Sequence, residues 1–473
     1  MRVILRSLLL SLTGFAVLPA WHCCRGQDSS IAAGAPESSQ QPQQVSSQKP
    51  VATSPSTNPS SQQATTPPPP PSTTSPSSSL DDTVDAGEMD DDLDHAPRRM
   101  SRWNEYSGPH FTAKAGMGFL VDTAAYAQDA ASKEQITMLP AQRLRDFRFV
   151  FGGGFPSLPR KVTYNVGVMY DAPTHAWFIR QTGIMVAVPR LWGNIFIGRS
   201  KEGFSLNKVM VGYDGWTMER STMSDATIPL LADGFKWLGY TPKHGFLWNF
   251  GYYNDWLSQG QSFSTYHNQT VLRAVWLPIH SDETRTVFHL GVNLRNGSPK
   301  QGQLQFRSRP EAFPAPYFVD TGKFASTNTK MAGYETYYRK GPLLLGSEYW
   351  WVNVSSPSTH NPSIHGGDFV ATWLVTGETR AYNTVQGAFR DVIPKKPLFS
   401  GGYGAVELVA RFSDIDLNSG TLQGGKFWRF TPMVNWYLTD YLRLIGTYGI
   451  GRLDRFNLKG NTQFFQTRLQ FEF

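Results

Sequence analysis

The chain ends in QFFQTRLQFEF, residues 463–473, and this stretch alternates between apolar and polar side chains. One face carries Phe465, Leu469, Phe471 and Phe473, with Thr467 between them, and the other carries Gln466, Arg468, Gln470 and Glu472. A period of two residues indicates a β-strand with one apolar face and one water-facing face. The edge strand of a soluble sandwich alternates in the same way. The rest of the chain therefore has to decide between the two.

The same alternation recurs from about residue 110 onward. It is clear in HFTAKAGMGFLVD (110–122), VTYNVGVMY (162–170), FLWNFGYY (246–253), TVFHLGVNLR (286–295) and VELVARFS (406–413). The apolar face is rich in aromatic residues, and the opposite face carries glycine and small polar or charged residues. Long helical periods are nearly absent, and the one good helix candidate is residues 123–135, which we expect in a loop.

This pattern is typical of an outer-membrane barrel, with an aromatic lipid-facing surface and a polar interior. In hydrocarbon every backbone N–H and C=O has to be paired, so a sheet must close on itself. We therefore predict an all-β fold, a transmembrane antiparallel β-barrel of about 16 strands of about 10 residues each. A barrel of that size encloses an aqueous channel. An even strand number places both termini on the same, periplasmic, side.

The first 26 residues are predicted to be a signal peptide. Arg2 and Arg6 precede the apolar stretch LLLSLTGFAVLPA, and small residues at Cys24-Arg25-Gly26 suit cleavage, with Ala20 as an alternative site. The apolar run is short for a membrane anchor. Both cysteines, Cys23 and Cys24, lie in this region, so cleavage after Gly26 leaves a mature chain without a disulfide or thiolate metal site.

Residues 27–97 form a low-complexity tail rich in Ser, Pro and Gln, which we predict to be disordered. Its end, DDTVDAGEMDDDLD, is strongly acidic. The tail is either an inert spacer or a segment that binds a partner. Residues 1–97 hold 4 of the 44 Lys and Arg but 10 of the 37 Asp and Glu, so the body from residue 98 to 473 carries about +13. Such a charge suits small anions, and we expect no nucleic-acid partner for an exported chain.

Several stretches of the body resemble the phosphate-selective porin O/P family of outer-membrane channels. They are LRDFRFVFGG (144–153), GRSKEGFSL (198–206), WTMER (216–220), WLVTGETRAYN (373–383), GAVELVARFSDIDLN (404–418) and VNWYLTDYLRL (434–444). They occur in the family's order, and the resemblance covers about residues 110–473. The resemblance implies a homotrimer of 16-stranded channels in the outer-membrane lipid. It also implies that the barrel assembly machinery receives the C-terminal strand.

The resemblance further implies an inward loop that narrows the channel and basic side chains that guide anions. We expect that loop after GRSKEGFSL, where Gly203 and Gly215 provide turn freedom. By match to the family, Arg145, Arg148, Lys201 and Arg220 are anion-guiding residues. Asp146 replaces a second arginine, Gly203 a proline and Ser200 an aromatic residue, so a general anion preference is better supported than a phosphate preference.

The alternation of side chains along each strand (strand parity) independently predicts which basic residues face the interior. The residues expected to face the lumen are Lys114, Arg148, Arg411, Arg429, Arg443 and Arg468. Rings of Lys and Arg favour anions in a channel, and arginine offers a charged fork that suits phosphate oxygens. Alternatively, each arginine pairs with an acidic neighbour such as Asp146, Glu407 or Glu472.

The sequence contains no recognisable catalytic or cofactor-binding motif, so we predict no enzyme activity, no cofactor and no metal. The predicted function is a passive channel, or porin, for small anions, with phosphate, polyphosphate and chloride as candidates. Two alternatives stay open. One is an outer-membrane barrel with an adhesion or receptor role, and the other is a secreted carbohydrate-binding β protein.

Overall fold

The computed structural model describes residues 102–172, 174–254 and 266–473. The predicted signal peptide (1–26) and low-complexity tail (27–97) lie outside these residues, so both stay predictions. Among the described residues, no helix combines the length and the apolar character that a membrane crossing requires.

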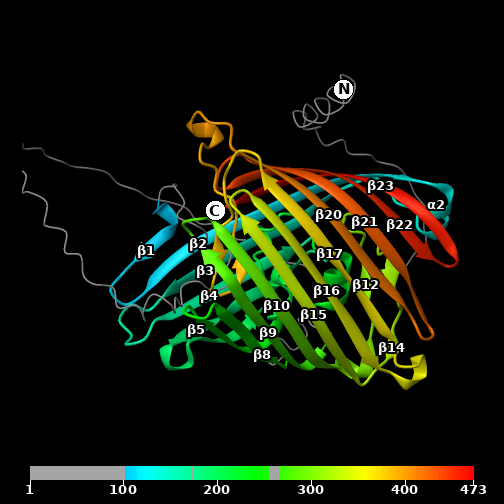
Figure 1. Ribbon diagram of the computed structural model, residues 1–473, viewed down its shortest axis with the longest axis horizontal. Helices are drawn as coiled ribbons and strands as arrows, with labels where there is room; N and C mark the ends of the chain where they lie inside the picture. Colours follow the sequence, from blue (N-terminus) through cyan, green and yellow to red (C-terminus); the bar gives the residue numbers. More distant parts are fainter. Residues whose placement is uncertain (1–101, 173, 255–265) are drawn as a thin grey trace, which may run out of the picture. The chain divides into compact units, whose positions relative to one another are not determined.

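Sixteen antiparallel strands form a closed barrel (Figure 1). In chain order they are β2 Thr112–Gln128, β3 Ala141–Gly154, β4 Val162–Asp171, β5 Ala176–Val188, β6 Gly193–Ser200, β7 Ala232–Thr241, β8 Phe246–Tyr253, β9 Tyr266–Ser281, β10 Thr286–Pro299, β15 Asn328–Lys340, β16 Leu343–Ser355, β17 Ser363–Leu374, β20 Ala405–Ser419, β21 Leu422–Tyr437, β22 Leu442–Arg455 and β23 Leu458–Glu472. Each pairs with its neighbour, and β23 pairs with β2 to close the sheet. The predicted all-β barrel is confirmed.

The remaining elements are short. Strand β1 (Glu105–Ser107) pairs with the start of β2, and three two-residue ladders join β11 (Gln303–Leu304) to β14 (Phe324–Ala325), β12 (Arg307–Ser308) to β13 (Val319–Asp320) and β18 (Tyr382–Asn383) to β19 (Ala388–Phe389). The α-helices are α2 Ala130–Gln135, α3 Leu206–Val209 and α4 Thr222–Thr227. The 3₁₀ turns are η2 Arg102–Asn104, η3 Pro189–Leu191, η4 Lys300–Gly302, η5 Pro357–Thr359 and η6 Leu398–Ser400.

The predicted helix over residues 123–135 is therefore correct only in its second half. The side chain of Asp129 accepts a hydrogen bond from the Ser132 backbone N–H and caps α2 at its N-terminus. Residues 123–128 belong to β2 instead, because all of them pair with β23, and Thr123 and Ala124 also pair with β3. Closure of the barrel outweighs the helix propensity of the alanine-rich segment.

The predicted faces of the strands are confirmed. On β10, Val292 and Leu294 are exposed on the outer surface, whereas His289, Asn293 and Arg295 are buried inside. On β23, Phe465 is exposed and Arg468 is buried. The two faces follow from the pleat of the strand, which sends successive side chains to opposite sides of the sheet.

The terminal aromatic residue is part of the sheet rather than a frayed end. The backbone of Phe473 exchanges two hydrogen bonds with Met117 of β2, at 3.0 and 3.1 Å. Its ring lies 5.4 Å from the ring of Trp103, measured between centroids. We call the end of the barrel at which Phe473 lies the C-terminal end, and the other the opposite end.

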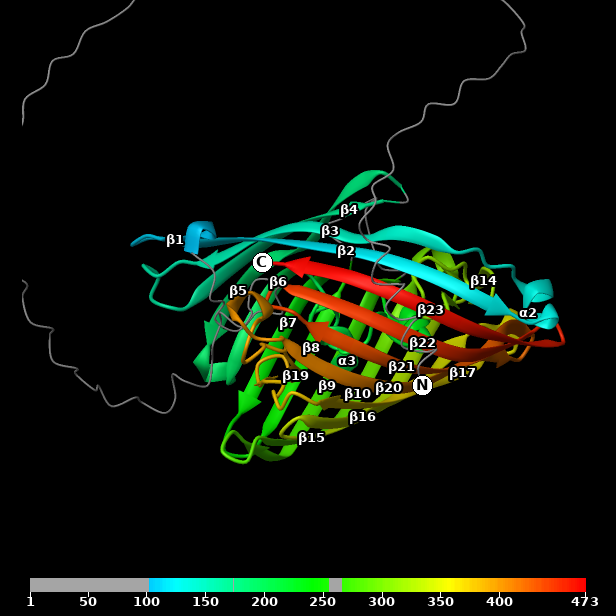
Figure 2. The same cartoon turned by 90° about the horizontal axis from the view of Figure 1, so that it is seen from above.

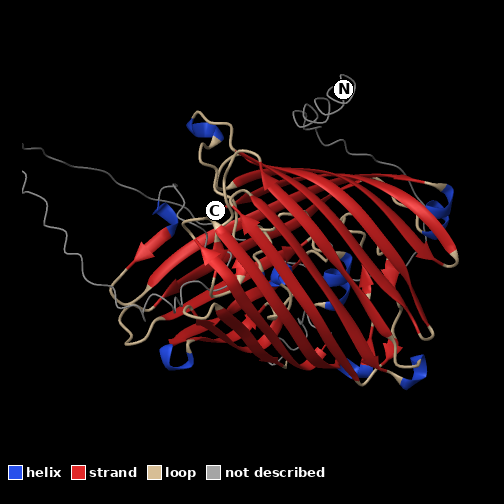
Figure 3. Cartoon of the chain, in the orientation of Figure 1, coloured by secondary structure: helices blue, strands red, loops and turns tan. Residues whose placement is uncertain are grey.

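Three long connections turn into the barrel. The first inner segment (201–231) joins β6 to β7 and the second (300–327) joins β10 to β15, both from the opposite end. The third (375–404) joins β17 to β20 from the C-terminal end. Figure 2 shows the short helix α3 of the first segment enclosed by the barrel wall, and Figure 3 shows short helices among the strands. The predicted inward loop after GRSKEGFSL is the first of these segments.

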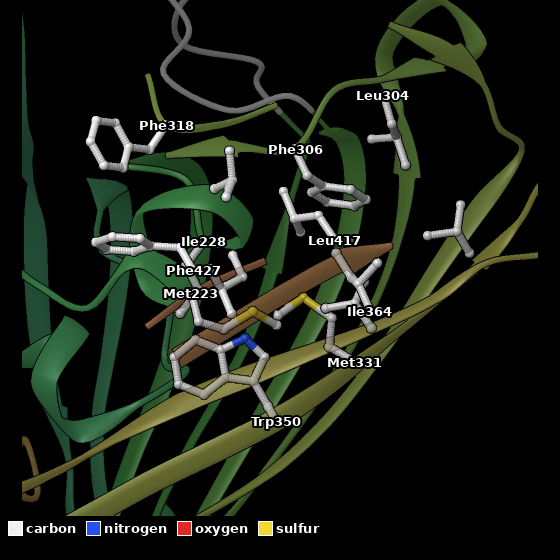
Figure 4. Close-up of a cluster of buried hydrophobic side chains, with 14 of the residues drawn as sticks. Met223, Ile228, Leu304, Phe306, Phe318, Met331, Trp350, Ile364, Leu417 and Phe427 are labelled. Atoms are coloured by element: carbon white, nitrogen blue, oxygen red, sulfur yellow. The ribbon is translucent and has the colours of Figure 1, made fainter. Parts of the chain in front are cut away.

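The interior toward the opposite end contains a large apolar cluster. Met223, Ile228, Leu304, Phe306 and Phe318 of the first two inner segments pack against the wall (Figure 4). The wall contributes Met331, Trp350, Ile364, Leu417 and Phe427, which project inward from five strands. A second apolar cluster surrounds Trp216 of the first inner segment. The inner segments are thus packed like a protein core and do not hang loosely in water.

Candidate functional site

The first and third inner segments meet inside the barrel. The Arg380 guanidinium donates a hydrogen bond of 2.7 Å to the backbone oxygen of Asp214 and forms an ion pair with Glu407. The ring of Phe389 lies 6.1 Å from that of Trp216. Segments that enter from opposite ends therefore meet beside Trp216, whose side chain is fully buried.

The wall, together with Arg380 of the third inner segment, holds the stretch 213–219 of the first inner segment by its backbone. Side chains around it donate to successive carbonyl oxygens: Arg443 to Tyr213 (3.2 Å) and Gly215 (2.8 Å), Arg380 to Asp214 (2.7 Å), Asn435 to Trp216 (2.9 Å), Arg468 to Met218 and Arg411 to Glu219 (2.7 Å). Four of these five donors are arginines, because carbonyl oxygens inside a barrel need donors that water no longer supplies. These hydrogen bonds to the backbone carbonyls fix the path of the segment through the barrel.

Glu219 joins two of the predicted residues at the end of that stretch. Arg145 contacts its carboxylate with two nitrogens, at 2.7 and 3.0 Å, and Arg468 contacts the same group. Burial by itself raises the pKa of Glu219, but the charges of Arg145 and then Arg468 outweigh it and lower the pKa to about 2. Glu219 is therefore ionised at every ordinary pH.

Arg145 reaches Glu219 because β3 contains a bulge. The register shifts between Leu120 and Val121 of β2, whose partners are Asp146 and Leu144, so Arg145 is an extra residue. A bulge of one residue turns a side chain that plain alternation would send outward. Asp146, the acidic residue in place of a family arginine, lies 3.5 Å from Arg148 as an ion pair.

Lys201 and Arg220 bind backbone oxygens near the end of helix α3. The Lys201 ammonium lies 2.8 Å from the Met210 oxygen, and Arg220 donates to the oxygens of Asn207 (3.0 Å) and Met210 (3.1 Å). Cations are favourable beside the unpaired carbonyls at a helix C-terminus. Nearby, burial and then the charge of Arg220 lower the pKa of Lys208 to about 7.

The prediction that the backbone freedom of Gly203 and Gly215 turns this segment inward is wrong. Neither glycine adopts a positive φ, whereas Ser205 does, at 71°. Gly203 is needed for a close approach, because a Cβ added there would overlap the side-chain amide of Asn249 on β8. Gly215 has room for a Cβ, with the nearest atom at 3.5 Å.

The predicted residues given by strand parity occupy two kinds of position. Arg148, Arg411, Arg429, Arg443 and Arg468 project inward and are buried. Arg411 pairs with Glu311 of the second inner segment, and Arg429 donates to the oxygens of Pro310 (2.5 Å) and Glu311 (3.1 Å). Lys114 lies apart from them at the C-terminal end, 3.5 Å from Glu105, on the rim of a hollow of about 680 Å³ beside β1. Their role in guiding anions stays a prediction.

The interior is less basic than expected. Among the described residues, 14 Lys and Arg side chains are buried against 12 Asp and Glu side chains. Acidic residues that the sequence reading missed, such as Glu311, Glu335 and Glu348, account for much of this balance. Glu335 lies 2.7 Å from Arg273 and 2.9 Å from His289. Parity gives the inward direction of Glu335 and Glu348, but the inward position of Glu311 depends on the fold of its loop.

Sequence reading also missed Arg380 and Arg273 as residues that hold the inner segments. Arg273 donates to the backbone oxygens of Gln386 (2.7 Å) and Gly387 (2.6 Å) in the third inner segment. Arg380 lies in the stretch WLVTGETRAYN, which carries the family resemblance, so that stretch was the available signal. Nothing in the strand pattern marked the third segment as one that enters the barrel.

Comparison with known proteins identifies the family. Three solved structures are similar. The outer-membrane channel DcaP of Acinetobacter baumannii is 9% identical, over 78% of this chain and 99% of that one, with a TM-score of 0.49. OmpT of Vibrio cholerae, an outer-membrane protein folded in vitro, is 12% identical, over 77% and 99%, with a TM-score of 0.48. An anion-selective porin from Comamonas acidovorans is 12% identical, over 76% and 100%, with a TM-score of 0.46.

Two sequence matches complete the comparison. An uncharacterised protein of Caulobacter vibrioides is 28% identical over 182 residues, which are 38% of this chain and 36% of that protein, so the match spans about a third of the relative's length. The profile of the family described as phosphate-selective porin O and P matches residues 138–473, most of the chain and nearly all of the barrel. The chain therefore belongs to the phosphate-selective porin O and P family, as an outer-membrane β-barrel.

Proposed function

We propose that this chain is a passive outer-membrane channel that prefers small anions, with phosphate, polyphosphate and chloride as candidates. The family to which it belongs supports the proposal. The residues proposed to guide anions are Lys114, Arg145, Arg148, Lys201, Arg220, Arg411, Arg429, Arg443 and Arg468. The proposed channel needs no cofactor, metal or catalytic residue.

The observation that carries the anion preference is the pairing of two inner arginines with neutral oxygens. Arg443 binds the carbonyl oxygens of Tyr213 and Gly215, and Arg429 binds two carbonyl oxygens and the Gln466 amide. Among the described residues, neither arginine has a carboxylate within 4.0 Å. The carboxylates of Glu407 and Glu311 act on Arg443 and Arg429 from beyond that distance. A cation without a close counter-charge in a poorly solvated interior attracts anions more strongly than it would in water.

The near balance of buried charge limits how strong this preference is. Because acidic groups pair with Arg148, Arg411 and Arg468, we expect a moderate preference for anions and not a strict one. Asp146 works in the same direction, since it lies beside Arg148 where the family carries a cation. Phosphate selectivity is the more specific part of the proposal, and it can fail while the general preference for anions holds.

Electrophysiology tests both parts. In planar bilayers with asymmetric KCl, the reversal potential should have the sign of an anion-preferring channel, and a cation-preferring sign would overturn the proposal. Phosphate added to one side should then reduce the chloride current if the channel binds it. Currents unchanged by phosphate would leave a general anion channel and remove the phosphate preference.

The assembly and orientation proposals rest on the family. We propose a homotrimer in outer-membrane lipid, inserted by the barrel assembly machinery through strand β23, with both termini in the periplasm. An oligomer that needs detergent and shifts in gel mobility on heating would support this assembly. A chain that stays soluble without detergent would instead favour the secreted carbohydrate-binding alternative, and a folded trimer without conductance would favour an adhesion or receptor role.

A further inference from the structure

Guanidinium groups and aromatic rings alternate in a continuous chain across the second inner segment. The carbon centres of the Arg307 and Arg309 guanidiniums lie 4.2 and 4.4 Å from the centroid of the Tyr317 ring. Arg309 also lies 5.5 Å from the Phe313 ring, and Arg145 of β3 lies 4.6 Å from that same ring. We call Arg307, Tyr317, Arg309, Phe313 and Arg145 the stacked arginine cluster.

The cluster is built into the barrel rather than placed on a loose loop. Glu311, in the middle of the 309–317 turn, binds Arg411 and Ser413 of β20, and its backbone oxygen accepts from Arg429 of β21. Phe313 then reaches Arg145 on β3, which is separated from β21 by three strands of the sheet. The turn therefore bridges the interior between two parts of the wall.

The cluster is accessible to solvent, unlike the buried arginines below it. Arg307 is exposed, and Arg309, Phe313 and Tyr317 are half-buried. The side chain of Arg145 is 30% exposed even though it pairs with Glu219. Because the second inner segment enters from the opposite end, these groups lie on the side from which a solute would enter at that end.

Arg307 and Arg309 keep their charge available. Within the described residues, neither guanidinium has a carboxylate within 4.0 Å, and the polar contacts of Arg309 are the Ala315 oxygen (3.0 Å) and the Tyr317 hydroxyl (3.4 Å). Asp225 is close by, but it binds the Arg309 backbone N–H and the Ser308 hydroxyl. The aromatic rings fix the orientation of the two guanidinium planes. Because a ring carries no negative charge, the guanidiniums keep their positive charge and their N–H donors for a ligand.

We propose that the stacked arginine cluster is a binding site for small organic anions that carry a carboxylate on a flat apolar body, such as an aromatic carboxylate. The proposal rests on the proposed channel function and names the class of solute that the channel admits from this end. An arginine fork binds a carboxylate with two parallel hydrogen bonds. The exposed parts of Phe313 and Tyr317 contact the flat body, an interaction that inorganic phosphate and acetate lack.

Competition measurements on the full-length trimer test this assignment. Benzoate and acetate are each added at the opposite end of single channels conducting chloride, and the concentration that halves the current is compared. We expect benzoate to act at about threefold to tenfold lower concentration than acetate, the range given by one aromatic ring pair. A ratio close to one would overturn the proposal, because it removes any role for the rings.

Variants separate the two parts of the site. Phe313→Leu keeps an apolar side chain but removes a ring, so it should bring the benzoate-to-acetate ratio toward one. Arg309→Gln should raise the half-blocking concentration of both anions. Arg452→Gln, which changes an exposed arginine on the outer surface of β22, is the control and should change neither. An unaltered ratio in Phe313→Leu would contradict the site.

Equilibrium dialysis of labelled benzoate against the detergent-solubilised trimer keeps the inference testable if no current is seen. Saturable binding that Phe313→Leu weakens, in a protein without conductance, would support the site while the channel proposal fails. Anion currents with no saturable benzoate binding would do the reverse. Heat-dependent gel mobility, equal to that of the unaltered protein, shows for each variant that the barrel has folded.

Discussion

Arg468 on the last strand forms a two-pronged ion pair with Asp122 on the first strand, with Nε–Oδ1 and Nη2–Oδ2 distances of 2.6 and 2.7 Å. The two residues are direct partners in the register that closes the barrel. Both side chains are buried, and the same guanidinium also holds Glu219 and the Met218 oxygen. One arginine thus connects the seam of the barrel to the segment that narrows it.

Replacing Asp122 by Asn should destabilise the closed barrel. The substitution removes one of the two carboxylates that neutralise buried Arg468, and breaking a buried ion pair on one side costs about 3–5 kcal/mol. The remaining contact with Glu219 places the expected loss at the lower end of that range. Urea unfolding in detergent, followed by heat-dependent gel mobility, measures it.

The control for that substitution is Asp454→Asn. Asp454 pairs with Lys459 at 3.5 Å on the surface, with side chains 35% and 60% exposed, and such pairs contribute about 1 kcal/mol or less. Equal unfolding midpoints for the two variants would contradict the role of the seam pair. A double variant that replaces both Asp122 and Arg468 by apolar residues should recover part of the lost stability.

Replacing Arg443 by Met should loosen the first inner segment. Arg443 donates to the oxygens of Tyr213 and Gly215, and hydrogen bonds to charged groups contribute about 1.5–3 kcal/mol each. Without them the segment moves more freely, and single-channel conductance should rise with more frequent current fluctuations. Arg452→Met on the outer surface is the matched control, and identical conductance in both variants would show that Arg443 does not hold the constriction.

The two glycines of the first inner segment should respond differently to alanine. Gly203→Ala forces a methyl group into the Asn249 side chain, and overpacking of this kind costs about 1–3 kcal/mol. Gly215→Ala should be tolerated, since the nearest atom to the new Cβ lies at 3.5 Å. Protease cleavage within residues 201–231 measures the docking of the segment, and equally fast cleavage of both variants would refute the close-approach role of Gly203.

Docking of the first inner segment should strengthen as the pH rises above 7. Burial lowers the pKa of Lys208 from its usual 10.5 to about 7, so between these values the released segment binds more protons than the docked one. Stability therefore increases through this window and is lower at pH 7 than at pH 9. The charged groups that act on Lys208 are Arg220, Asp225, Glu202 and Lys201.

Protease protection of residues 201–231 at pH 7 and pH 9 checks this expectation. Lys208→Met removes the lysine but leaves Glu202, whose pKa burial raises, so the difference between the two proteins isolates Lys208. A pH dependence that is the same in Lys208→Met would assign the effect to another group. Circular dichroism of the barrel at both pH values controls for changes outside the segment.

Strand positions and their two faces were predictable from the sequence because the pleat of a strand is a local property. Alternation in 286–295 and 463–473 gave the inward direction of Arg295 and Arg468 without any knowledge of their neighbours. The bulge at Arg145 was not predictable in this way, since one extra residue on β3 is defined only by its pairing with β2. The family match pointed to Arg145, but not to the reason it faces inward.

The sequence by itself determined a closed barrel, its approximate strand number and the side on which each strand residue lies, because these follow from alternation and from the need to pair every backbone group in lipid. Only the tertiary structure decided what fills the interior. Whether Arg443 meets water, a carboxylate or the oxygens of Tyr213 and Gly215 depends on where a segment more than 200 residues earlier comes to lie. Contacts between residues so distant in the chain leave no periodic signal, and they alone determine which partner each inner cation has.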